Sequence, residues 1–179
     1  LMWVNYPHMP TGAKATKDTF EKLIAFGKKH NIVIVNDNPY SFILNNNTQS
    51  ILQVEGAKEI ALELNSLSKS FNMAGWRVGM LLGSQQFLNE VLKVKTQMDS
   101  GMFYGIQKGA IKALELTNNW FDELNKIYIE RRRLVWNLAD KLHCTYDKNS
   151  SGMFVWAKLP SGITSEEMIN DLLYNKNIF

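Results

Sequence analysis

The chain is organised around residues Asn65–Gly79, which read NSLSKSFNMAGWRVG. This segment follows an alternating apolar run, Ile60–Leu64, which predicts a β-strand. It then combines serines and Lys69 among small residues with Arg77 eight positions further on. An amine can form a Schiff base with an aldehyde, whereas hydroxyls and a guanidinium are suited to holding a phosphate. The segment therefore predicts a site for an aldehyde that carries a phosphate, and pyridoxal phosphate is the natural example.

The composition is that of an ordinary globular protein. The chain has 179 residues, of which 45% are hydrophobic and 21% charged, with a net charge of +3. The basic clusters Lys28–His30 and Arg131–Arg133 lie on predicted helices, which favours solvated helix faces over nucleic-acid binding. The lone Cys144 excludes an intrachain disulfide and a cysteine-rich zinc site. We expect a cytoplasmic protein with no nucleic-acid partner, no membrane and no metal.

Both ends of the chain resemble the interior of a fold. The apolar residues Leu1–Val4 have the pattern of a buried strand, and the last residues, Asn177–Phe179, begin another apolar segment. The length suits one large domain, or one domain and part of a second. We therefore expect an internal fragment of a longer protein.

The first part of the chain has the pattern of a parallel α/β unit. Leu1–Val4 and Ile32–Val35 predict buried strands, and a helix from a Thr16 cap to about His30 connects them, so the strands should run parallel. Further elements are expected as a strand at Arg77–Leu82, helices at about Ser84–Lys95, Tyr104–Leu116 and Asn119–Leu142, strands at Cys144–Tyr146 and Met153–Ala157, and a helix at Thr164–Asn175. The fold class is α/β, a mostly parallel sheet with helices on both faces, followed by a long linking helix and the start of an α+β unit.

Three polar segments each follow a predicted strand: Asn5–Gly12, Asp37–Tyr40 and Ser66–Lys69. The carboxyl ends of parallel strands meet at one edge of a sheet, where ligands bind in this architecture. Beside a pyridine ring, Asp37 would keep the ring nitrogen protonated and Tyr40 could donate to the phenolic oxygen. Taken singly, each residue is more often structural, so the prediction depends on their convergence.

Three of these motifs resemble those of one family. Ser66–Gly79 closely resembles the cofactor-lysine motif of the class I/II aminotransferases, which are fold-type I pyridoxal phosphate enzymes. Asn36–Tyr40 resembles their Asp-x-x-Tyr motif, and Asn5–Gly12 resembles their Asn-Pro-Thr-Gly loop. Gly152–Trp156 resembles the start of the family's small domain. The likeness therefore covers the whole chain.

The order and the spacing of the motifs match as well, with 28 residues from Met9 to Asp37 and 32 from Asp37 to Lys69. The resemblance implies that Lys69 forms the aldimine with pyridoxal phosphate and moves the proton between the substrate Cα and the cofactor. It implies that Asp37 pairs with the pyridine nitrogen and that Tyr40 binds O3′. The phosphate would be bound by Ser66, Ser68 and Arg77.

The resemblance also implies the domains and the activity. Residues 1–135 would be the second part of a pyridoxal phosphate-binding large domain, and residues 136–179 the start of a C-terminal small domain. The intact protein would be an aminotransferase of amino-acid metabolism, a homodimer that exchanges an amino group between an L-amino acid and a 2-oxo acid. The fragment lacks the family's N-terminal half and its C-terminal substrate-binding arginine, so we expect it to be inactive alone. Met9 stands where the family usually has an asparagine that donates to O3′, and a thioether cannot donate.

Two other outcomes share these motifs. The same scaffold can serve a C–S lyase or a decarboxylase, and it also occurs as a non-catalytic effector domain of transcription regulators. Lys69 and Asp37 are both present, which favours retained chemistry. The amino donor and acceptor are not specified by the sequence.

Overall fold

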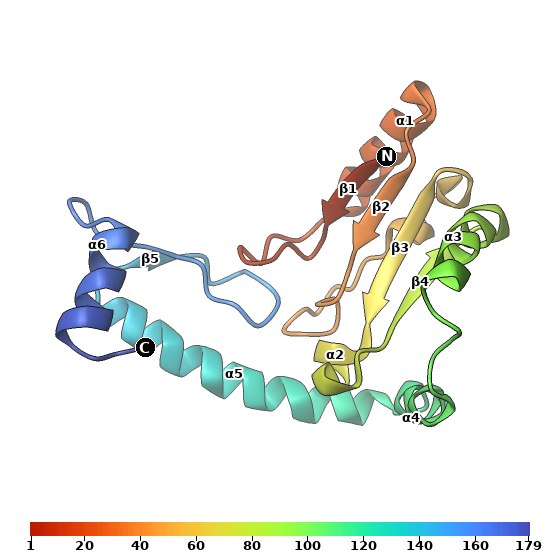
Figure 1. The fold of residues 1–179 in the computed structure, drawn as a ribbon. Helices are drawn as coiled ribbons and strands as arrows, with labels where there is room; N and C mark the ends of the chain where they lie inside the picture. Colours follow the sequence, from red (N-terminus) through yellow and green to blue (C-terminus); the bar gives the residue numbers. More distant parts are fainter.

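The computed structural model describes residues 1–179 and contains a four-stranded sheet in the order β1-β2-β3-β4 (Figure 1). β1 pairs with β2 and β2 with β3 in parallel, whereas β4 runs antiparallel to β3. The strands are Met2–Asn5 (β1), Ile34–Asp37 (β2), Ala61–Ser66 (β3) and Gly79–Gly83 (β4). The predicted α/β class with a mostly parallel sheet is confirmed.

Six α-helices accompany this sheet, and the longest of them leads to a second, smaller unit. The helices are Lys17–His30 (α1), Leu67–Ser70 (α2), Gln85–Met98 (α3), Tyr104–Leu114 (α4), Asn118–Lys141 (α5) and Ser165–Asn170 (α6), which a π-helical segment, Asp171–Asn175, continues. Figure 1 shows α5 running from α2 and α4 to the unit that contains α6 and the antiparallel pair Thr145–Tyr146 (β5) and Ala157–Lys158 (β6). None of the helices combines the length and the apolar character needed to cross a membrane.

The crossover helix α1 begins where the sequence predicts. The Thr16 hydroxyl accepts a hydrogen bond from the Thr19 amide at 3.1 Å, and the Thr19 hydroxyl accepts one from the Thr16 amide at 3.3 Å. This reciprocal cap satisfies backbone donors that the first helical turn leaves unpaired. At the other end, Asn31 adopts the left-handed conformation that ends many helices. The chain can then turn directly into β2.

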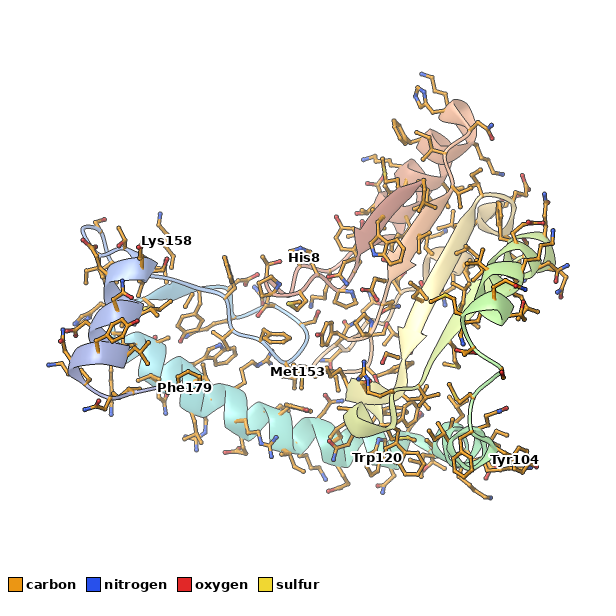
Figure 2. All side chains as sticks on the ribbon, viewed as in Figure 1. His8, Tyr104, Trp120, Met153, Lys158 and Phe179 are labelled. Atoms are coloured by element: carbon orange, nitrogen blue, oxygen red, sulfur yellow. The ribbon has the colours of Figure 1, made fainter.

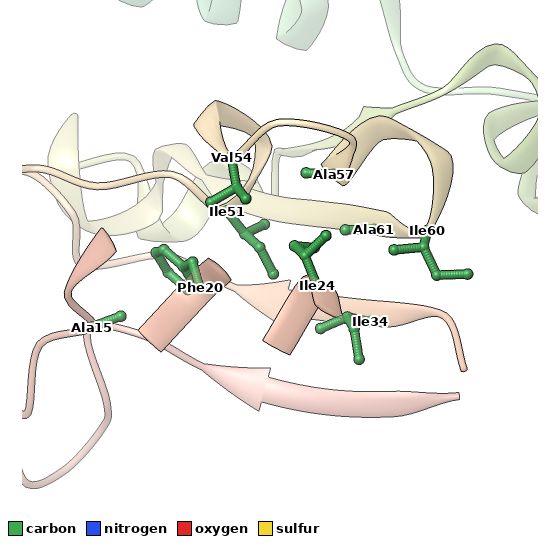
Figure 3. Packing of buried hydrophobic residues seen from close by; sticks show 9 residues of the cluster. All are labelled: Ala15, Phe20, Ile24, Ile34, Ile51, Val54, Ala57, Ile60 and Ala61. Carbon is green, nitrogen blue, oxygen red and sulfur yellow. The ribbon is translucent and has the colours of Figure 1, made fainter. Parts of the chain in front are cut away.

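The main apolar core lies between α1 and one face of the sheet (Figure 3). Phe20 and Ile24 project from α1 onto Ile34 of β2 and Ala61 of β3. Two short 3₁₀ turns, Ile51–Gln53 (η1) and Ala57–Glu59 (η2), close this layer. The neighbouring β2 residues Ile34 and Val35 point to opposite faces and are both buried, as expected for a strand covered on both sides.

Two strands of the main sheet begin two residues later than the sequence predicts. β2 lies two residues further along than Ile32–Val35, because the Ile32 amide is bonded to the Gly27 carbonyl at the end of α1. Asp37 is consequently the last residue of the strand. β4 begins at Gly79 and not at Arg77, because Arg77 takes up the left-handed conformation with φ 54°.

The predicted strand Met153–Ala157 is wrong over most of its length, since β6 contains only Ala157 and Lys158. The preceding segment makes its contacts with the loop after β2. The Gly152 amide donates to the Ile43 carbonyl at 2.8 Å, and the Phe154 ring packs edge-on against Tyr40. The apolar pattern there reflects docking onto another loop and not pairing within a sheet.

The α1 layer provides a direct test of the core. Phe20 is 1% exposed, and its replacement by alanine should lower the free energy of unfolding by about 3–5 kcal/mol through lost burial and a residual cavity. Phe26 lies on the same helix but is 40% exposed, so Phe26→Ala should cost far less. Urea unfolding of both variants measures the difference, and equal losses would contradict this core assignment.

Candidate active site

The parallel register brings the carboxyl ends of three strands to one level. Asn5 at the end of β1 pairs with Asp37 at the end of β2, and Asp37 pairs in turn with Leu64 of β3. β3 continues two residues further and leads directly into α2, which contains Lys69. The three polar segments therefore lie at the same edge of the sheet, as their positions after predicted strands indicate.

Asn5 fixes the chain on both sides of this edge. Its Nδ2 donates to the Asp37 carbonyl at 2.6 Å, and its Oδ1 accepts from the Met9 amide at 2.7 Å. Sequence reasoning assigned no role to this residue. Because both ends of the amide are engaged, Asn5 holds the loop after β1 against β2.

The Asp37 carboxylate has no hydrogen-bond donor within the protein. Its backbone carbonyl is bonded to Asn5, but no side chain or amide reaches the carboxylate oxygens. Partial burial raises the pKa of Asp37, because the charged form loses contact with water. A half-buried acceptor of this kind is suited to a ligand that brings an N–H group, above all a cationic one.

Tyr40 is buried three residues beyond Asp37. Its ring lies edge-on to Phe154, with centroids 5.8 Å apart and planes at 85°. Burial raises the pKa of Tyr40, and the nearby charge of Asp37 raises it further. The phenol is therefore held in its protonated form, in which it can donate a hydrogen bond.

Lys69 lies in the short helix that follows β3. Ser66 caps this helix, since its Oγ accepts from the Ser68 amide at 3.1 Å. Lys69 itself is half-buried, and its ammonium group takes part in none of the ion pairs or hydrogen bonds of the structure. The amine is thus placed beside the strand ends without a competing partner.

The lysine helix is anchored from below by apolar contacts. Leu67 is buried with Met73 and Val78, in a cluster that α4 completes. The Trp120 indole of α5 donates to the Ser70 carbonyl at 2.9 Å. These contacts fix the backbone on both sides of Lys69, so its position follows from the packing of α2.

Arg77 is the least constrained of the predicted site residues. It is exposed, and its Nη1 donates only to the Ala74 carbonyl, at 2.9 Å. The pairing of Ser66 with Gly79 and the bond from the Leu67 amide to the Val78 carbonyl bring this region back to the start of α2. The serine hydroxyls and the guanidinium thus belong to one end of the β3–β4 pair, although no bond joins them.

The loop after β1 is also held by the second unit. Figure 2 shows the segment with Met153 reaching toward the loop with His8, and the Ser151 amide donates to the Gly12 carbonyl at 2.9 Å. Gly12 has φ +71°, and a Cβ there would lie 2.5 Å from the Ser151 carbonyl oxygen. A glycine is therefore required at this contact. His8 makes a local 2.7 Å hydrogen bond to Thr11.

The residues present fit pyridoxal phosphate in their chemistry. Asp37 offers an acceptor without a partner for a ring N–H, and Tyr40 offers a phenol donor. Lys69 offers a free amine. The Ser68 hydroxyl and the Arg77 guanidinium are donors that could bind a phosphate. Met9 is half-exposed and has no donor in its side chain. Of Tyr40 and Met9, only Tyr40 could therefore donate a side-chain hydrogen bond to the phenolic oxygen of the cofactor.

Sequence reasoning overlooked Glu63, a carboxylate beneath this edge that is 3% exposed. It is the single charged residue in the strand Ala61–Ser66, and that position in an otherwise apolar run was the available signal. Its oxygens accept hydrogen bonds from Asn36, Asn38 and the Ile51 amide.

Comparison with known sequences gives a consistent result. A family model described as aminotransferase class I and II matches residues 1–179. An LL-diaminopimelate aminotransferase of Aquifex aeolicus is 37% identical over 175 residues, and one of Maridesulfovibrio salexigens is 39% identical over 176 residues. Each alignment covers 97% of this chain but 45% of the relative, so the chain spans about half the length of the curated relatives it matches.

Solved structures agree with the sequence comparison. The apo structure of BacF from Bacillus subtilis superposes with a TM-score of 0.91 at 34% identity, over 99% of this chain and 46% of that one. A probable N-succinyldiaminopimelate aminotransferase of Thermus thermophilus has a TM-score of 0.83 at 32% identity, over 90% of this chain and 44% of that one. With its lysine helix, its strand-end aspartate and its long α5, this chain belongs to the class I and II aminotransferase family.

Proposed function

We propose that the intact protein is a pyridoxal phosphate-dependent aminotransferase that moves an amino group between an L-amino acid and a 2-oxo acid. The observation that carries this proposal is that Asp37, at the end of β2, and Lys69, in the helix directly after β3, lie at the same edge of the sheet. The Asp37 carboxylate has no hydrogen-bond donor and the Lys69 amine has no partner. The chain also belongs to a family whose named relatives are aminotransferases.

When bound, pyridoxal phosphate supplies an aldehyde that condenses with amines and a ring that accepts electron density from the substrate Cα. Lys69 would hold the cofactor through Nζ and, once displaced by the substrate amine, move a proton at the substrate Cα. Asp37 would accept the hydrogen bond of the ring nitrogen and keep it protonated. Tyr40 would donate to O3′, since its raised pKa keeps the phenol protonated.

The phosphate would be held by Ser66, Ser68 and Arg77. Ser66 caps α2 and Ser68 lies in its first turn, whereas the exposed Arg77 has guanidinium donors left after its bond to Ala74. A planar guanidinium can bind two phosphate oxygens at once. Hydroxyl and guanidinium donors would thus fix the cofactor at the end remote from the ring nitrogen.

Membership in this family also favours a particular domain organisation and oligomeric state for the intact protein. Residues 1–135 would form the second part of the cofactor-binding large domain and residues 136–179 the start of the small domain, within a cytoplasmic homodimer. Since the relatives are about twice as long as this chain, residues 1–179 alone should not transfer amino groups. The names of the relatives favour transfer over elimination or decarboxylation, and diaminopimelates belong in the first panel of amino donors to be tested.

Covalent attachment tests the role of Lys69. Borohydride treatment of the full-length protein with pyridoxal phosphate should fix one cofactor on the peptide that contains Lys69, and Lys69→Ala should abolish this product. Lys58→Ala removes an exposed lysine with no ion pair and should leave trapping unchanged. Mass spectrometry of the digested protein measures both results, and an unmodified wild type would refute the cofactor assignment.

A donor screen tests the reaction type. With 2-oxoglutarate as acceptor, a productive amino donor should yield glutamate in proportion to the donor consumed. Release of ammonia without an acceptor would instead indicate elimination, and release of carbon dioxide would indicate decarboxylation.

The donors around O3′ give a third prediction. Met9 cannot donate and the Asn5 amide is already engaged, so Tyr40 would be the main donor to this oxygen. Tyr40→Phe should raise the Kd for pyridoxal phosphate about 10–100-fold, as expected for a lost hydrogen bond to a charged acceptor. In a Met9→Asn background the same change should cost less, because the new amide can donate. Equal losses in both backgrounds, measured by equilibrium dialysis, would exclude this arrangement.

The raised pKa of Asp37 gives a fourth prediction, about stability. The folded protein binds the Asp37 proton more tightly than the unfolded chain, so stability falls as pH rises from the ordinary carboxyl range through the raised pKa. Asp37→Asn should therefore raise the thermal midpoint of the cofactor-free protein at pH 7 and flatten its dependence on acidic pH. With cofactor the sign should reverse, because the variant loses the ring-nitrogen partner. A lower midpoint for the cofactor-free variant would contradict the desolvation of Asp37.

A further inference from the structure

Glu63 is a buried carboxylate without a cation. It is 3% exposed, and none of the ion pairs of the structure involves it. Burying a charge is costly unless hydrogen bonds replace the lost water. Three donors supply them: Asn36 Nδ2 at 3.2 Å and the Ile51 amide at 3.1 Å to Oε2, and Asn38 Nδ2 at 3.3 Å to Oε1.

The two asparagines are the residues on either side of Asp37. Side chains alternate between the faces of a strand, so Asn36 and Asn38 project to the face of Glu63 while Asp37 projects to the other. Asn36 and Glu63 are also direct cross-strand partners. One carboxylate therefore fixes both neighbours of Asp37 from beneath the sheet.

The same group connects the neighbouring loops. Asn36 exchanges hydrogen bonds with the backbone of Tyr6 in the loop after β1, at 3.0 and 3.4 Å. Ile51 opens the turn η1 and is fully buried. Glu63 thus holds β2, β3 and η1 together, and it reaches the loop after β1 through Asn36.

The orientation of Asn38 indicates that Glu63 acts as an acceptor. Asn38 is 2% exposed, and its Oδ1 is a buried oxygen without a partner. Turning the amide around would place this oxygen against Glu63 Oε1, acceptor against acceptor. In this orientation Asn38 donates to Glu63 and its Oδ1 has no partner, so the contact with Glu63 is the hydrogen bond that orients the side chain of the residue after Asp37.

We propose that Glu63 is a positioning residue that directs the Asp37 carboxylate toward the cofactor's ring nitrogen by clamping Asn36 and Asn38 from the opposite face. This inference rests on the proposed function for the identity of the ligand. The clamp itself is a property of the protein without ligand, so it can be tested without cofactor.

The experiment uses the full-length protein and four single variants, to which the second readout adds an Asp37→Asn background. Glu63→Leu removes all three acceptor contacts, and Asn38→Ala removes only one, so the second variant decides the question if the first fails to fold. Glu63→Gln is the conservative change, because its carbonyl can still accept from Asn36 and Ile51 while its amide can donate to a reoriented Asn38. Glu55→Leu makes the same apolar change at an exposed glutamate in the same region.

The first readout is the titration of the Asp37 carboxyl carbon by NMR in the cofactor-free protein. Loss of the clamp should admit water to the carboxylate and move the midpoint down toward the ordinary carboxyl range in Glu63→Leu and Asn38→Ala. Glu63→Gln should stay close to the wild type, and Glu55→Leu should not differ from it. An unchanged Asp37 titration in both disruptive variants would overturn the proposal.

The second readout is the Kd for pyridoxal phosphate. Glu63→Leu should raise it about tenfold, and Glu63→Gln should restore most of the loss. In an Asp37→Asn background the effect of Glu63→Leu should largely vanish, because Glu63 acts through Asp37. An equal effect in both backgrounds would show that Glu63 only stabilises the fold and does not act through Asp37. If the wild type binds no cofactor, the proposed function fails, while the titration still decides whether the clamp exists.

Discussion

The parallel register of β1, β2 and β3 is the constraint on which the site depends. It sets Asn5, Asp37 and Leu64 side by side, although they are far apart in the sequence. A shift of one residue in β2 would turn Asp37 to the opposite face of the sheet and would turn Asn36 and Asn38 to the face that Asp37 now occupies. The apolar contacts of α1 prevent such a shift, because Ile34 would lose its place in the core.

The two faces of the sheet have different roles: one presents groups that can bind a ligand, and the other contains the residues that support them. On one face, Asp37 keeps its carboxylate free for a ligand, and burial raises the pKa of this group and of the nearby Tyr40. On the other face, Glu63 and its amide donors fill a polar position next to an apolar core. A residue that leaves its hydrogen-bonding capacity free for a ligand depends on neighbours whose capacity is used within the protein.

The second unit is joined to the site through main-chain groups. The Ser151 amide meets Gly12, the Gly152 amide meets Ile43, and Arg132 of α5 donates to the Ser150 carbonyl at 2.9 Å. The first two bonds reach the loops after β1 and β2, which contain Met9 and Tyr40, and the third holds the same segment against α5. A displacement of this segment would therefore move the loops that contain Met9 and Tyr40.

The sequence by itself determined the α/β class, the cap of α1, the long α5 and the set of chemically distinctive residues, because each depends on local periodicity or on a short motif. It could not determine the limits of β2 and β6, which depend on where the backbone finds partners: Ile32 bonds to α1, and Gly152 bonds to a loop. It also gave no role to Asn5 or Glu63. Their partners lie in other strands, so only the tertiary structure decided that an ordinary amide and a buried carboxylate hold the position of Asp37.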